Sequence, residues 1–147
     1  MKTKFIYAAV FTMIVTVHFS VAQQVTRNLE ENVFFIVEVS IKPNQFDNFL
    51  KVANEMSEVV NKKEAGALNY EWTISQDSTT CYILERYAST EAAMGHIKLF
   101  REEFAAKFSE VVEVKGFTLY GKPGPEVIEA LGVPAEMSRV PVAGFAR

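Results

Sequence analysis

The chain has little of what cysteine or histidine chemistry requires. Among its 147 residues there are one cysteine and two histidines. The lone Cys81 excludes an internal disulfide, and its place in a strand-like segment is typical of a small buried hydrophobe. His18 lies in an apolar N-terminal run, so a chain that loses this run keeps one imidazole, His96. Zinc, copper and non-haem iron sites built from several histidines are therefore excluded, and we expect no metal.

Other familiar signatures are also missing. The sequence has no glycine-rich phosphate loop, no nucleophile elbow, no Cys–His pair and no dinucleotide fingerprint. We therefore expect a protein without a cofactor. Lys and Arg number 15 against 18 Asp and Glu, a net charge of −3, and no basic cluster is interleaved with aromatic residues. Nucleic acid is therefore not an expected partner.

The N-terminus has the pattern of a secretory leader. Lys2 and Lys4 precede an apolar run over residues 5–19, and small residues follow at 20–22. This predicts a signal peptide over residues 1–22, cleaved after Ala22. The alternative is an uncleaved membrane anchor, but a span needs about 20 apolar residues and this run is shorter. We expect an exported, periplasmic or secreted protein with no membrane attachment after cleavage.

Residues 33–121 have the periodicities of one α+β domain. Strand patterns cover 33–41, 67–75, 80–87 and 111–120, and helical patterns cover 46–64 and 90–109. The order β-α-β-β-α-β predicts a ferredoxin-like fold, in which a four-stranded antiparallel sheet carries both helices on one face. Residues 122–147 form a C-terminal tail, with a short helix expected over 126–131.

The turn at residues 76–79 fixes a register for the hairpin. Pairing Ser75 with Thr80 predicts three further cross-strand pairs. They are Tyr70 with Glu85, Trp72 with Ile83, and Leu68 with Tyr87. All six side chains would share the face that the helices cover, because side chains alternate across a strand.

His96 lies on the apolar side of the second helix, one turn before Phe100. One interpretation is a buried histidine bonded to a neighbour. The other is a pair with Glu85, since a buried carboxylate must find a partner or take a proton. Such a His–carboxylate pair is a candidate proton acceptor. Glu85 has its own alternative, in which its side chain simply reaches the sheet edge.

Four aromatic residues complete the candidate site. Tyr70, Trp72, Tyr87 and Phe100 are either plain core or a flat, ligand-binding wall. With the polar groups beside it, such a wall suits a planar aromatic ligand. The opposite sheet face carries Glu38, Ser40, Tyr82, Leu84 and Arg86. This face is too apolar to be left in water, which predicts a homodimer.

Two segments resemble one known family. Residues 65–71 (AGALNYE) and 84–96 (LERYASTEAAMGH) are similar to the pattern of the antibiotic biosynthesis monooxygenase domain. The resemblance spans about 33–121 and implies a dimeric α+β barrel. Tyr70, Glu85, Tyr87 and His96 fall on the family pattern.

Some members of this family oxidise quinols or polycyclic phenols with molecular oxygen, without metal or flavin. The haem-degrading relatives use an Asn on the first strand and a His late in the second helix. This chain has Glu38 and Ser40 on that strand and FAAK at 104–107, which disfavours haem degradation.

The expected function is a cofactor-independent monooxygenase acting on a quinol, phenolic or polycyclic aromatic substrate. In this hypothesis His96 and Glu85 are catalytic, and Tyr70, Trp72, Tyr87 and Phe100 bind the substrate. The alternative is a domain of the same fold that binds a small aromatic ligand without catalysis, or is associated with stress.

Overall fold

A computed structural model describes residues 32–132, 138–139 and 142. The expected signal peptide over 1–22 lies outside the described residues, as does most of the tail beyond Gly132. The predicted order of strands and helices through residue 121 is confirmed. The elements are β1 (Val33–Ile41), α2 (Phe46–Lys63), β2 (Ala67–Ile74), β3 (Thr80–Tyr87), α3 (Thr90–Leu99), the π-helix η1 (Phe100–Phe104), α4 (Ala105–Val111), β4 (Val112–Gly121), α5 (Pro125–Leu131) and β5 (Ser138–Arg139).

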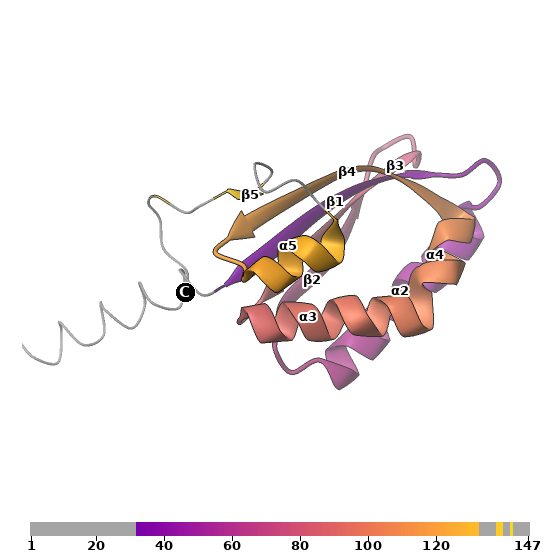
Figure 1. Ribbon diagram of the computed structural model, residues 1–147. Helices are drawn as coiled ribbons and strands as arrows, with labels where there is room; N and C mark the ends of the chain where they lie inside the picture. The colour runs from indigo at the N-terminus through magenta and orange to yellow at the C-terminus, as the bar shows by residue number, and fades with distance from the viewer. Residues whose placement is uncertain (1–31, 133–137, 140–141, 143–147) are drawn as a thin grey trace, which may run out of the picture.

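The strands form one sheet in the order β2-β3-β1-β4-β5, and the helices cover one of its faces (Figure 1). The first four strands pair antiparallel, as predicted. The two-residue β5 pairs parallel with β4 and was not predicted. Two residues are too few to show an alternating pattern, so nothing in the sequence indicates this strand.

β1 is the central strand of the sheet, and its alternate residues on the helix-covered face are apolar. Val33, Phe35, Val37 and Val39 are all buried. Val37 lies opposite Ile83 on one side and Phe117 on the other. This apolar row forms the floor of the core under α2 and α3.

The hairpin register is confirmed at two of the predicted pairs and wrong at the third. Tyr70 lies opposite Glu85, and Trp72 opposite Ile83. A bulge in β2 places Ala67, rather than Leu68, opposite Tyr87. The extra residue of a bulge turns its side chain out of the alternation, so Leu68 is 52% exposed.

The second long helix is not continuous. It runs as α3, then one π-helical turn, then α4, and the N–H of Ala105 bonds to the carbonyl of Phe100. The apolar positions His96, Phe100, Phe104 and Phe108 advance by four. Each such step drifts by about 40° on a helix with 3.6 residues per turn. One wider turn corrects the drift, and Phe104 and Phe108 remain buried.

The predicted short helix in the tail is present as α5. Pro125 opens the helix and Gly132 closes it at a φ of 64°, a left-handed conformation that glycine adopts without strain. Val127 is fully buried, and α5 lies beside α3 (Figure 1). In the part of the chain that the structure describes, no helix has the length and apolar character to cross a bilayer.

Candidate functional site

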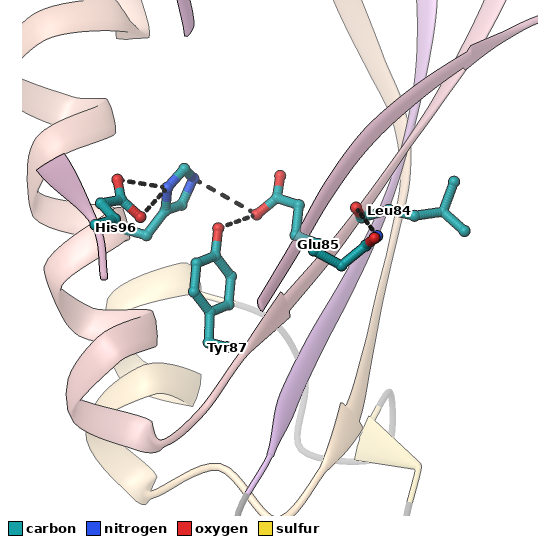
Figure 2. A network of polar contacts seen from close by, with 6 residues as sticks. Leu84, Glu85, Tyr87 and His96 are labelled. Atoms are coloured by element: carbon teal, nitrogen blue, oxygen red, sulfur yellow. Dashed lines mark hydrogen bonds and ion pairs between the residues drawn. The ribbon is translucent and has the colours of Figure 1, made fainter. Parts of the chain in front are cut away.

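A buried polar cluster joins α2, β3 and α3. Glu64 follows the last residue of α2, Glu85 comes from β3, and His96 comes from α3. The imidazole Nδ1 of His96 lies 3.0 and 3.1 Å from the two carboxylate oxygens of Glu64. Its Nε2 lies 3.5 Å from Oε2 of Glu85 (Figure 2). His96 and Glu85 are each only 6% exposed, so the predicted pair does meet inside the protein.

Tyr87 contacts both Glu85 and His96. Its hydroxyl donates to Oε2 of Glu85 at 2.6 Å (Figure 2), and its ring packs 5.1 Å from the imidazole. The sequence placed Tyr87 on a ligand-binding wall, but the structure buries it completely. Its contacts hold Glu85 and His96 in place.

Burial and mutual charge shift the protonation of both central groups. Burial raises the pKa of Glu85, with a further contribution from the Glu64 charge, against the lowering effects of His96 and Tyr87. Burial by itself lowers the pKa of His96, but the hydrogen bond to Glu64 and the charges of both carboxylates outweigh it, so that pKa is raised. Two groups this close titrate as a pair. The pair is a stronger proton acceptor than an ordinary carboxylate.

The cluster opens on an apolar cavity of about 260 Å³. Tyr70, Glu85 and His96 form its polar end. Its walls are mainly apolar and include Phe35, Ile83, Ile97, Phe100, Phe108 and Phe117. An apolar cavity of about 150 Å³ accepts benzene, so this one has room for about two fused rings. Such a cavity suits a small planar aromatic molecule.

Tyr70, which lines this cavity and also a second hollow against α2, carries an unpaired donor. Its hydroxyl is buried and has no hydrogen-bond partner among the described residues. Burial, together with the charges of Glu85 and Glu64, raises the pKa of Tyr70, so its hydroxyl keeps its proton. A ligand oxygen at the polar end would give this donor the partner that it lacks.

The remaining predicted residues divide between two places. Phe100 lines the cavity, as predicted. Trp72 does not. It packs edge-on against Tyr70, Phe49 and Phe108 and lines a second hollow against α2. Its indole Nε1 is buried without a partner in the described part of the chain.

Sequence reasoning missed Glu64 and the part of the cavity wall contributed by Arg101, Ala130 and Leu131. Glu64 did carry a signal. A carboxylate at the C-terminal end of a helix faces the negative end of the helix dipole and is unfavourable there unless something else binds it. Arg101, Ala130 and Leu131 carried no such signal in the sequence. They line the cavity because α5 docks on α3, and this is a contact between distant segments.

Within the described ranges, no group of three or more His, Cys, Asp and Glu side chains is arranged to hold a metal ion.

Residues 32–99 match the sequence model of the family described as antibiotic biosynthesis monooxygenase. This stretch contains Glu64, Tyr70, Glu85, Tyr87 and His96. Residues 32–99 are therefore similar in sequence to the antibiotic biosynthesis monooxygenase domain. The resemblance of the two sequence segments to this family is thereby confirmed. No curated protein sequence matches the chain.

Solved structures show the same fold. MupZ from Pseudomonas fluorescens superposes with a TM-score of 0.63 at 18% identity, over 80% of this chain and 95% of that one. A putative antibiotic biosynthesis monooxygenase from Caulobacter crescentus gives 0.52 at 21%, over 66% and 92%. SnoaB, a cofactor-independent oxygenase from Streptomyces nogalater, gives 0.53 at 9%, over 64% and 95%. At these identities the likeness establishes the ferredoxin-like α+β fold.

Proposed function

We propose that this protein is a cofactor-independent monooxygenase that oxidises a phenolic or quinol-type aromatic with molecular oxygen. The observation that carries the proposal is the buried His96–Glu85 pair at the polar end of an otherwise apolar cavity. The monooxygenase family match and the fold shared with SnoaB support it.

The first step is removal of a proton from the substrate hydroxyl. Glu64 binds Nδ1 of His96, which directs Nε2 toward Glu85 and the cavity. The His96–Glu85 pair accepts the proton. Because the pKa values of the pair are raised, they lie nearer to the pKa of a phenol, which favours the transfer. Tyr70 donates its free hydroxyl to the substrate oxygen and stabilises the phenolate.

The second step is reaction of the phenolate with oxygen. The electron-rich ring passes an electron to O₂, and a C–O bond forms between a ring carbon and one oxygen atom. The O–O bond then breaks, and the second oxygen atom leaves as water with protons that come from the substrate. The substrate supplies all four electrons that O₂ takes up, so no external reductant enters. The apolar walls contribute by excluding water and orienting the ring.

The location that we propose for this reaction rests on the signal peptide expected from the sequence. If residues 1–22 are a cleaved signal peptide, the substrate is met outside the cytoplasm. An exported oxygenase of this kind would act on aromatic compounds in the periplasm or beyond it.

One observation favours a second function. Glu85 already accepts a bond from Tyr87, and both imidazole nitrogens of His96 face carboxylates. A cluster satisfied in this way can simply hold α2, β3 and α3 together. The same cavity would then bind a small aromatic ligand without turnover.

Oxygen uptake by the purified protein over a panel of benzo- and naphthohydroquinones separates the two functions. We expect uptake that survives a metal chelator and falls by about 10²-fold in His96→Gln, the usual loss for a general base. Glutamine keeps an N–H donor for Glu64, so this variant is expected to fold. Melting temperature is measured on the same samples. Full activity in well-folded His96→Gln contradicts the catalytic role, and ligand binding without uptake by the wild type favours the second function.

A further inference from the structure

The cavity has two ends that come from different parts of the chain. Its polar end, Tyr70, Glu85 and His96, lies within residues 32–99, which match the family. The other end is formed by Arg101, Ala130 and Leu131, all beyond that match. We call these three residues the α5 end. The reacting groups therefore lie within the family match, while the α5 end lies outside it.

Arg101 is the charged residue of the α5 end. It is exposed although it lines the cavity, which places it at the mouth. One of its Nη2 hydrogens is donated to the carbonyl oxygen of Ala130. A guanidinium has five N–H donors, and Arg101 makes no ion pair with a carboxylate among the described residues. Donors and charge remain for a ligand.

We propose, building on the oxygenase function above, that Arg101 binds a carboxylate carried by the aromatic substrate. The carboxylate sits on the side of the ring system away from the reacting hydroxyl. His96 is buried inside the cavity, whereas Arg101 is exposed at its mouth. A ring system that lies between them can present one substituent to each. A guanidinium also has the planar geometry that matches a carboxylate.

Charge gives the substrate one orientation in the cavity. The polar end contains Glu85, with Glu64 behind His96. A ligand carboxylate placed there would meet like charge. At the mouth the same group meets a cation. The hydroxyl is therefore directed to His96 and the carboxylate to Arg101, so Arg101 is a specificity-determining residue.

The test compares two probes that differ only in charge, a hydroxynaphthoate and the matching hydroxynaphthamide, with the hydroxyl and the second group on opposite rings. Binding is measured under nitrogen, where no turnover occurs. We expect the wild type to bind the acid about ten-fold more tightly than the amide, the range for a charge-assisted hydrogen bond. Salt should weaken this preference. Arg101→Gln, which keeps a donor for Ala130, should lose the preference while binding the amide unchanged.

Lys98→Gln is the matched control, because Lys98 is an exposed cation on α3 that does not line the cavity. It should keep the preference. Equal binding of both probes by the wild type, or no binding of either, overturns the proposal. If Arg101→Gln weakens the binding of both probes equally, the proposal is also overturned. The role of Arg101 is then to hold α5 in place. An Arg101-dependent preference without oxygen uptake would leave the carboxylate site standing and remove the oxygenase function.

Discussion

At the scale of single residues, the site depends on three side chains that no short motif brings together. Glu64, Glu85 and His96 come from three elements and meet where at most a tenth of each side chain is exposed. His96 and Glu85 bind a proton more tightly there than in an unfolded chain. The cluster therefore couples protonation to folding.

This coupling predicts a pH dependence with a definite sign. Because both pKa values are raised on folding, the folded chain holds more protons, and the cluster's contribution to the free energy of unfolding falls as pH rises. The loss begins above the usual carboxyl value of 4.5 and continues through the raised pKa of His96, above its usual 6.5. Glu85→Gln, which removes one of the two groups, should flatten this dependence.

Urea unfolding of wild type and Glu85→Gln between about pH 5 and pH 8 measures the difference. Glu58→Gln is the control, because Glu58 is an exposed carboxylate on α2. It should leave the dependence as in the wild type. A steeper slope in Glu85→Gln would contradict the arrangement of the cluster.

The residue scale also shows what the sequence can and cannot predict about the site. The contact between His96 and Glu85 could be predicted from local patterns. The alternation of side chains along β3 gives the face of Glu85, and the helical period of α3 gives the face of His96. Glu64 could not be placed by such patterns, since its contact with His96 depends on how the end of α2 approaches α3. Arg101 was missed for the same reason, because the docking of α5 is set by tertiary packing.

At the scale of elements, the approach of the α2–β2 turn to α3 holds Glu64 against His96. A Cβ added at Gly66 would lie 2.6 Å from Cβ of Ala92, the third residue of α3. Gly66 also accepts a backbone bond from Ala88 at 2.9 Å. The turn can therefore move away from α3 only at a cost.

Gly66→Ala is predicted to destabilise the protein by about 1–3 kcal/mol, the usual range for overpacking, and to lower oxygen uptake because Glu64 is displaced from His96. Gly95→Ala is the matched control. It sits in α3 beside His96, and a Cβ there meets nothing within 4 Å. It should stabilise by about 0.5–1 kcal/mol, since alanine favours a helix over glycine. Thermal unfolding with activity on the same samples checks both, and a neutral Gly66→Ala would contradict the close approach.

Two of the departures from the predicted elements are of one kind. The strands and α2 follow from local periodicity and are confirmed. The bulge in β2 and the π-helical turn each come from one extra residue that keeps distant side chains packed. The run of apolar positions spaced by four was a usable sign of the π turn, but Leu68 gave no comparable sign of the bulge.

At the scale of the whole molecule, the sheet face away from the helices has no cover within the described chain. Tyr82 and Tyr120 are 43% and 37% exposed on it, and Phe34 and Leu84 are only partly buried. Apolar groups gathered on one face are typical of an interface between subunits. The homodimer expected from the sequence stays a prediction.

Leu84→Glu should convert the predicted dimer to a folded monomer, because a carboxylate buried between two facing sheets is unpaired. Leu50→Glu is the matched control, since Leu50 is 41% exposed on α2, in the helix layer. Light scattering at micromolar concentration gives the mass, and circular dichroism checks the fold. A wild type that is monomeric under these conditions, or a Leu84→Glu variant that stays dimeric, ends this interpretation.

The position of Trp72 has a practical consequence. It is the only tryptophan in the chain. Its indole nitrogen is buried and has no hydrogen-bond partner among the residues that the structure describes. Its ring lies edge-on to Tyr70, which lines the cavity. Its fluorescence should therefore appear at short wavelength, as for an indole in an apolar medium. An aromatic molecule entering the cavity comes close enough to quench that emission. The protein thus contains its own optical reporter of occupancy, and ligand titrations can be followed on the unlabelled chain.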